Sequence, residues 1–180
     1  VIGYPAYDPN YGGIGVFGYD SDSDTWIKIE FDNTFTNPVK YGYSVATNGN
    51  YIVTGGISST SSSSSGNGAV AILSISSDKT SVSLLSEIKE PNDSGATNNF
   101  GYSVDIKNTN SIVVGSPNSN TYGTAYIYDI GGNLKQSITL GLSDTTIIDS
   151  TLSATETFGS TVKFSNNKLY ISDSTYNSSV

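Results

Sequence analysis

Apolar and polar residues alternate along much of the chain, in short runs separated by Gly, Asn, Asp and Ser. In the stretch 124–130, for example, Ala125 and Ile127 alternate with Tyr126 and Tyr128. Period-two alternation is typical of β-strands, because successive side chains of a strand point to opposite faces of its sheet. Strong helix formers are sparse, and no long window fits the spacing of an amphipathic helix better than this alternation. The pattern therefore predicts an all-β fold.

The alternating runs predict four consecutive strands in each of two central stretches. The expected strands are 43–47, 51–54, 69–76 and 81–88 in the first stretch, and 102–106, 111–115, 124–130 and 134–140 in the second. The stretch before them predicts strands at 14–19 and 25–31. Gly- and Asn-rich segments such as Gly131-Gly132-Asn133 separate these runs and favour tight turns, since both residue types tolerate left-handed backbone angles.

The sequence repeats itself, and two anchors mark the repeat. The first anchor is an aromatic residue followed by Gly, at positions 41–42, 100–101 and 158–159. The second is the small residue that ends a β-branched run, at Gly3, Gly55, Gly115 and Ser172, with separations of 52, 60 and 57 residues. Fixed anchors at unequal spacing indicate constant strands joined by variable loops. We expect one domain, 1–180, with units near 1–40, 41–99, 100–157 and 158–180, of which the first and last are partial.

Four antiparallel strands in a repeat of about 50 to 60 residues are typical of a β-propeller blade. Phe100-Gly101 followed by Gly115-Ser116-Pro117 resembles the FG-GAP repeat of integrin α-chain heads and of many bacterial, viral and protist surface proteins. Looser copies are Tyr41-Gly42 with Gly55-Gly56 and Phe158-Gly159 with Ser172-Asp173. The segment 12–31 looks like the last two strands of a plain FG-GAP repeat, so the resemblance covers essentially the whole chain.

The resemblance implies a β-propeller in which the aromatic residue packs between neighbouring blades and the glycine lets two backbones approach closely. About three blade-equivalents are present, whereas propellers usually have about four to eight blades. We therefore expect the chain to be a fragment of a larger propeller, or to assemble with further blades or subunits. Integrin-type repeats carry an Asp-rich calcium loop after the first strand, but the corresponding turns 47–50, 107–110 and 165–167 contain no carboxylate. Calcium needs charged oxygen ligands, so the resemblance implies no metal at these turns.

Charge and hydropathy exclude several classes of partner. The chain has 16 acidic and 8 basic residues, a formal net charge of −8. This charge argues against binding to nucleic acid or to an anionic membrane surface, which both attract Lys- and Arg-rich faces. No apolar run is long enough for a transmembrane helix, so we expect no membrane insertion in this segment. The chain begins with 1-VIGYP-5, which has no signal-peptide pattern, so any signal would lie upstream.

Catalytic chemistry is poorly supported. The chain contains no His and no Cys, which removes the commonest general base, zinc ligand and thiol nucleophile. We find no nucleophile elbow, no phosphate-binding loop and no recognisable pair of carboxylates. We therefore expect no catalytic residues, no cofactor and no enzyme activity. A hydrolase or lyase with its site in the central channel of a closed propeller remains the weakest alternative.

Two kinds of candidate modification or metal site remain open. Asp20, Asp22 and Asp24 have the Asp-x-Asp-x-Asp spacing of a calcium loop. The loop lacks the sixth-position Gly and the distal Glu of an EF-hand, so a solvated acidic turn fits better than a cation site. Asn92 and Asn177 each begin an Asn-x-Ser glycosylation sequon. The Ser-rich stretch 58–68 fits a flexible surface insertion, an O-glycosylated tract or a loop that contacts a ligand.

Tyrosine supplies the candidate ligand-binding residues. Five of the 13 tyrosines lie in the expected loop after the second strand of a blade: Tyr4, Tyr7, Tyr11, Tyr122 and Tyr176. Tyrosine offers a large contact area at low entropic cost, although each of these rings could instead pack on its own loop or the next blade. We expect an extracellular or surface-exposed module for adhesion or for binding a protein or glycan partner. The alternative is a virion or fibre component used in assembly or host attachment.

Overall fold

The computed structural model describes residues 1–5, 12–31, 35–36, 39–58, 68–91, 98–120, 122–139 and 157–174. Within these residues all regular structure is β-strand, arranged in four separate sheets. The first sheet has the order β1-β2-β3, from Ile2–Tyr4, Gly13–Asp20 and Thr25–Ile29. The all-β prediction is therefore confirmed.

The two central sheets each contain four strands that follow one another in the chain. One has the order β4-β5-β6-β7, from Val39–Thr47, Tyr51–Ser58, Ala69–Ile75 and Val82–Lys89. The other has the order β8-β9-β10-β11, from Ser103–Ile106, Ser111–Ser116, Thr124–Asp129 and Leu134–Thr139. The last sheet pairs β12 with β13, from Thr161–Ser165 and Lys168–Ser172. Every pairing is antiparallel, as in the blades of a β-propeller.

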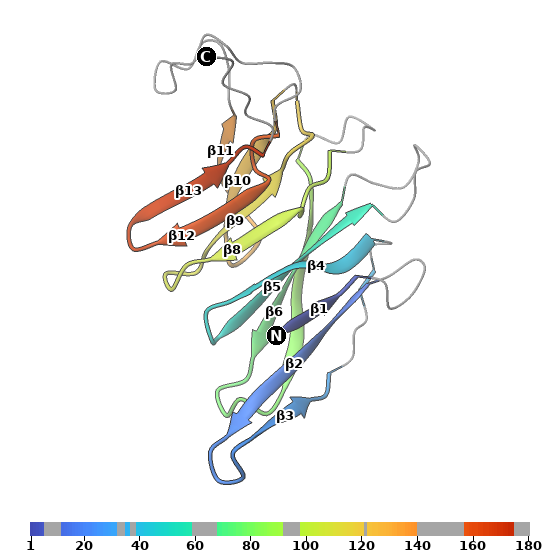
Figure 1. Cartoon of the computed structure of the whole chain (residues 1–180), viewed down its shortest axis with the longest axis vertical. Helices are drawn as coiled ribbons and strands as arrows, with labels where there is room; N and C mark the ends of the chain where they lie inside the picture. The colour runs from blue at the N-terminus through green and yellow to red at the C-terminus, as the bar shows by residue number, and fades with distance from the viewer. Residues whose placement is uncertain are drawn as a thin grey trace.

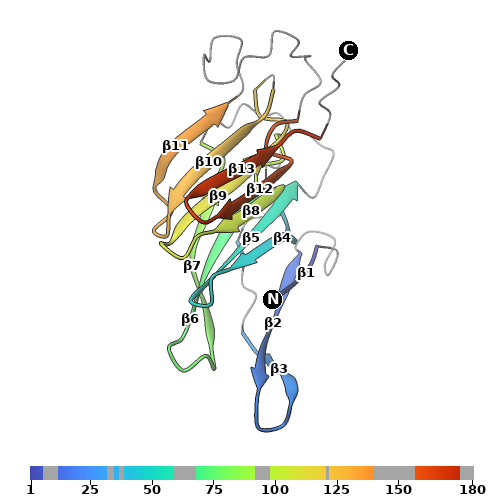
Figure 2. The same ribbon diagram turned by 60° about the vertical axis from the view of Figure 1, so that its left-hand side comes forward.

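The sheets lie one beside the next in chain order, with β1–β3 at one end and β12–β13 at the other (Figures 1 and 2). We refer to them as blades 1 to 4. The first strand of each four-stranded blade, β4 or β8, contacts the strands of its neighbours: β1 and β2 contact β4, β4 contacts β8, and β8 contacts β12. The structure thus places the repeat units as consecutive blades rather than as one continuous sheet.

Two predicted strands are longer than their sequence pattern suggested. We expected 43–47 and 51–54, whereas β4 begins at Val39 and β5 continues to Ser58. The extension is possible because the β4–β5 register shifts between Tyr41 and Ser44, which lets Val39–Tyr41 pair with Gly56–Ser58. Such a bulge inserts extra residues into one strand without ending the ladder. The Gly55-Gly56 pair therefore lies inside a strand and does not end it.

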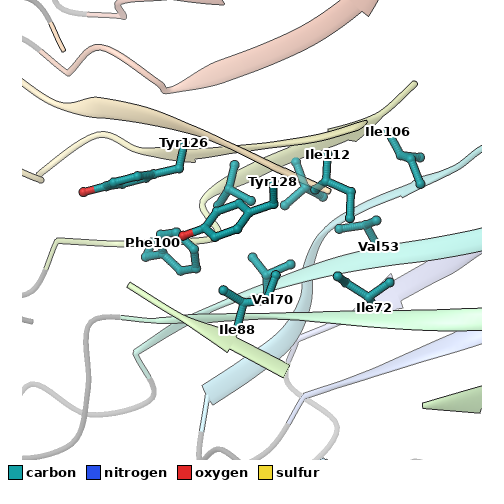
Figure 3. Packing of buried hydrophobic residues seen from close by; sticks show 11 residues of the cluster. Val53, Val70, Ile72, Ile88, Phe100, Ile106, Ile112, Tyr126 and Tyr128 are labelled. Carbon is teal, nitrogen blue, oxygen red and sulfur yellow. The ribbon is translucent and has the colours of Figure 1, made fainter. Parts of the chain in front are cut away.

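The hydrophobic core lies between the blades. One cluster joins blade 2 to blade 3 and contains Val53, Val70, Ile72, Ile88, Phe100, Val104, Ile106, Ile112, Val114, Tyr126 and Tyr128 (Figure 3). A second cluster includes Ile14 and Val16 of blade 1 with Tyr41, Ile52 and Leu73 of blade 2. A third joins Val113 and Ala125 of blade 3 to Phe158 and Val162. All three repeat aromatics, Tyr41, Phe100 and Phe158, are buried in these clusters, as the resemblance implied.

Glycines bring the backbones of adjacent blades into contact. A Cβ atom built on Gly3, Gly55 or Gly115 would lie 2.0 Å from the carbonyl oxygen of Gly42, Gly101 or Gly159 in the following blade. These three partner glycines have φ of +86°, +87° and +97°, a region that residues with a side chain rarely adopt. The aromatic-Gly pair and the later small residue therefore form one repeated contact, which explains why both anchors recur together in the sequence.

Candidate interaction surface

The two ends of the blades differ in the length of their connections. The turns β2–β3, β4–β5, β6–β7, β8–β9, β10–β11 and β12–β13 contain two to six residues each. The connections β1–β2, β3–β4, β5–β6, β7–β8, β9–β10 and β11–β12 contain seven to 21 residues each. Because successive strands are antiparallel, each set lies at one end of its blade. The long-loop end carries the variable part of the repeat, and the short-turn end carries its constant part.

Two of the five candidate tyrosines lie in the described part of the chain, and both rings pack within the molecule. Tyr4 is half-buried and its hydroxyl donates to the carbonyl oxygen of Ile14 at 2.9 Å. Its ring covers Gly13, where an added Cβ would lie 2.6 Å from the ring edge. Tyr122 is half-buried against the cluster that joins blade 3 to blade 4. Tyr7, Tyr11 and Tyr176 lie outside the described residues.

The acidic segment predicted as a turn forms the β2–β3 hairpin turn. The Asp20 carboxylate accepts a hydrogen bond from the Asp22 backbone N–H at 3.1 Å and one from the Ser23 hydroxyl at 2.6 Å. These bonds hold the pKa of Asp20 below its usual value, and the bond from Ser23 has the largest effect. The Tyr19 hydroxyl donates to Asp24. Across the residues that the structure describes, no group of three or more Asp, Glu, His or Cys side chains is placed to hold a metal ion.

The two glycosylation sequons cannot be placed, because Asn92 and Asn177 lie outside the described residues. Most of the Ser-rich stretch, 59–67, also lies outside them. In the chain it lies between β5 and β6.

At the short-turn end, asparagines join neighbouring blades. The Asn48 side-chain amide donates to the Lys107 carbonyl oxygen at 3.2 Å and to Asn110 Oδ1 at 3.1 Å. Asn48 Oδ1 accepts from the backbone N–H groups of Asn50 and Tyr51, which closes its own turn. Lys107 Nζ donates to Asn167 Oδ1 of the next blade at 3.2 Å. The turns that correspond to integrin calcium loops are thus linked directly by neutral side chains and one lysine.

A buried carboxylate lies between blades 2 and 3 near the long-loop end. Glu90 is only 5% exposed. Its Oε2 accepts from the Asn98 side-chain amide at 2.8 Å, and its Oε1 accepts from the Tyr126 hydroxyl at 3.1 Å and the Ser116 hydroxyl at 3.2 Å. Three donors compensate for much of the cost of burying a charged group. The sequence analysis missed Glu90, since a single Glu after an alternating strand has no distinguishing pattern.

We expect Glu90→Ala to lower the free energy of unfolding by about 1–3 kcal/mol, because it removes the acceptor of the buried Asn98 amide and the Glu90 bonds of the Ser116 and Tyr126 hydroxyls. Equilibrium urea unfolding of the 180-residue chain measures this loss. Glu30→Ala is the matched control, since the Glu30 side chain is 77% exposed and pairs with the exposed Lys28. Equal effects of the two substitutions would show that the Glu90 hydrogen bonds do not stabilise the blade contact.

A second buried carboxylate joins blades 3 and 4. Asp105 of β8 accepts from the Phe164 backbone N–H at 2.6 Å and from Lys163 Nζ at 2.9 Å, both on β12. The Asp105 side chain is 6% exposed, whereas Lys163 is 68% exposed. The backbone bond is therefore shielded from water, while the ammonium group keeps contact with solvent. The contact between blades 2 and 3 thus contains the carboxylate of Glu90, and the contact between blades 3 and 4 contains the carboxylate of Asp105. Each carboxylate accepts hydrogen bonds within its contact.

Tyr43 of β4 lies beside Tyr102, the residue before β8, with ring centroids 5.0 Å apart. Both residues directly follow the aromatic-Gly pair of their unit. The pKa of Tyr43 is raised from its usual 10.0 to about 12. The largest cause is the hydrogen bond with Tyr102, and burial and charge repulsion by Tyr102 contribute less. The contact therefore favours the neutral form of Tyr43.

We expect an absorbance titration of the chain to show a tyrosine that ionises near pH 12 and that is lost in Tyr43→Phe. Because the folded-state pKa is raised, the stabilising contribution is complete below the unfolded pKa of about 10 and disappears as the pH rises through about 12. Tyr170→Phe is the control, since Tyr170 is an exposed tyrosine on blade 4. A titration that Tyr43→Phe leaves unchanged would contradict the cross-blade hydrogen bond.

Comparison with known families adds a direct observation. Residues 90–128 match the family model of the FG-GAP repeat. This segment is an FG-GAP repeat. The match runs from Glu90 through β8 and β9 to near the end of β10, so it includes the buried carboxylate, the Phe100-Gly101 pair and Gly115. The resemblance inferred from the sequence is therefore confirmed for this part of the chain.

The FG-GAP assignment and the sheet topology support each other. The repeat forms a four-stranded antiparallel blade with β11, and blade 2 has the same strand order. FG-GAP repeats typically occur in extracellular proteins and are generally non-catalytic. A search of curated proteins found no match to the chain. Among the described residues, no helix has the length and hydrophobicity needed to cross a membrane.

Proposed function

We propose that this chain is a non-catalytic, surface-exposed propeller module that binds a protein or glycan partner through the long-loop end of its blades. The observation that carries this proposal is the difference between the two ends of the blades. Connections of seven to 21 residues lie at one end, and turns of two to six residues at the other. Variable loops on a rigid scaffold are a common arrangement for recognition.

The packing between the blades supports the rigidity that such a scaffold needs. Each blade contact combines apolar burial with backbone approach at glycine, and the contacts of blade 3 also include Glu90 and Asp105. Both carboxylates are buried and accept hydrogen bonds from the protein itself. They therefore serve blade packing, and this use favours a binding module over a hydrolase for this segment.

Binding of the labelled chain to a printed glycan array and to an array of extracellular proteins tests the proposal. We expect saturable binding on at least one surface. Combined replacement of Tyr7, Tyr11 and Tyr176 by Ser should weaken it by about tenfold or more, since tyrosines are common anchors of binding surfaces. Thr109→Ala is the control, because Thr109 is exposed in a short turn at the opposite end. No binding on either array, or equal losses in both variants, would contradict the proposal.

A further inference from the structure

Tyr43 and Tyr102 form a ring pair at the contact between blades 2 and 3, away from both ends of the chain. Their ring centroids are 5.0 Å apart, their ring planes are tilted by 50°, and their side chains are hydrogen-bonded to each other. Tyr43 is 39% exposed and Tyr102 is half-buried, so a small solute can reach the pair. In the part of the chain that the structure describes, the other aromatic pairs combine tyrosine with Phe or Trp. Within these residues, a contact between two accessible phenols is therefore particular to this position.

The backbone on both sides of the pair is held in place across the blade contact. Tyr43 lies in the bulge where the β4–β5 register shifts between Tyr41 and Ser44, and such bulges re-aim side chains. The Ser44 hydroxyl donates to the Gly101 carbonyl oxygen at 2.8 Å. This bond ties the residue after Tyr43 to the residue before Tyr102. The two rings are thus carried by backbone segments that are fixed to each other.

The next blade contact shows that blades pack without such a pair. There the Ser103 hydroxyl donates to the Gly159 carbonyl oxygen at 2.8 Å, which repeats the serine bond that joins blades 2 and 3. The residue after Gly159 is Ser160 and not a tyrosine. The glycine and serine contacts therefore recur at both blade contacts, whereas the facing tyrosines occur at one of them. Blade packing alone does not require the tyrosine pair.

We propose that Tyr43 and Tyr102 are a site of oxidative cross-linking, at which a peroxidase that consumes hydrogen peroxide joins the two rings as dityrosine. Each phenol loses one electron and one proton and becomes a phenoxyl radical. The two radicals form one carbon–carbon bond between the ring carbons next to their oxygens. The hydrogens on those two carbons then move to the oxygens as protons, which restores both hydroxyls. The two electrons and two protons that leave the tyrosines reduce one hydrogen peroxide to two water molecules.

The geometry favours this bond over coupling between two molecules. The rings need to approach by less than the length of one bond, and their tilt is compatible with dityrosine, whose rings are twisted about their common bond. A radical formed on one ring already has its partner in contact, so the reaction within the chain has a high effective concentration. The bond joins two repeat units covalently and closes a long loop of the chain. It therefore restricts the unfolded chain and stabilises the blade contact, whichever partner the long loops bind.

Brief treatment of the 180-residue chain with a haem peroxidase and an equimolar amount of hydrogen peroxide tests the proposal. We expect the blue fluorescence of dityrosine in the monomer, a mass lower by two hydrogen atoms, and cross-linked peptides that contain Tyr43 and Tyr102. The yield in the monomer should not change with protein concentration, and the cross-linked chain should unfold at a higher urea concentration. Tyr43→Phe should lower the monomer yield by about tenfold or more, since it removes the partner phenol.

Tyr19→Phe and Tyr170→Phe are the controls, because these tyrosines are 53% and 55% exposed and lie on blades 1 and 4. Both should leave the yield in the monomer unchanged. Tyr102→Phe should repeat the effect of Tyr43→Phe, and circular dichroism checks that each variant is folded. Treatment of the wild type in urea should remove the preference for this pair, since the preference comes from the fold. A wild type that forms no dityrosine or forms it only between molecules, or monomer dityrosine that persists in Tyr43→Phe, would overturn the proposal.

Discussion

Gly115→Ala is expected to be strongly destabilising, with a loss of more than about 3 kcal/mol in the free energy of unfolding. An added Cβ would lie 2.0 Å from the Gly159 carbonyl oxygen and 2.3 Å from the Ser103 hydroxyl oxygen. The Ser103 side chain could rotate, but the backbone carbonyl could move only if blade 4 moved with it. Interiors packed at this density do not absorb such a displacement.

Gly18→Ala is the matched control for this prediction. Gly18 lies in β2, where an added Cβ would meet only the side chain of Ile29, at 3.5 Å. We expect a change within about 0.5 kcal/mol. Urea denaturation followed by circular dichroism measures both variants under identical conditions. If Gly115→Ala were as stable as Gly18→Ala, the close backbone approach between blades 3 and 4 would be wrong.

Phe100→Ala is expected to cost about 3–5 kcal/mol, since it empties the aromatic position at the contact of blades 2 and 3. Phe100 is fully buried, and its ring packs edge-on against Tyr126 and Tyr128 at centroid distances of 5.6 and 6.2 Å. The neighbours belong to one cluster that spans both blades (Figure 3). Loss of the ring should therefore weaken the contact between two blades as well as the interior of one.

Phe100→Leu separates the loss of volume from the loss of the aromatic ring. It retains most of the apolar contact, and we expect about half of the destabilisation or less. Leu85→Ala is the surface control, because Leu85 is exposed on β7 and should change the stability by less than about 0.5 kcal/mol. Similar effects of Phe100→Ala and Leu85→Ala would contradict a core located between the blades.

The strands and the repeat were predictable from the sequence because they rest on local patterns. Alternation identified the strands of blades 2 and 3 to within a few residues, except where the bulge after Tyr41 lengthened β4 and β5. The aromatic-Gly pair and the distant small residue were recognised separately. Only the structure shows that they meet, since Gly55 approaches Gly101 of the next blade and Gly115 approaches Gly159.

The polar contacts between blades were not predictable, because they depend on distances between residues far apart in the chain. Glu90 accepts from Tyr126, and Asn48 donates to Lys107, across separations of 36 and 59 residues. Neither residue has a local motif. The candidate tyrosines were chosen by residue type and by their position in a loop, and neither property tells where a side chain points. In the structure Tyr4 and Tyr122 pack inward.

The most direct test of the stacked-blade account is a nuclear Overhauser measurement on the chain with isotope-labelled tyrosines. Tyr43 and Tyr102 belong to different repeat units, and their ring centroids are 5.0 Å apart only if blades 2 and 3 lie side by side. The account predicts cross-peaks between the two rings that disappear in Tyr43→Leu. A well-folded chain whose tyrosine cross-peaks all lie within single units would contradict it.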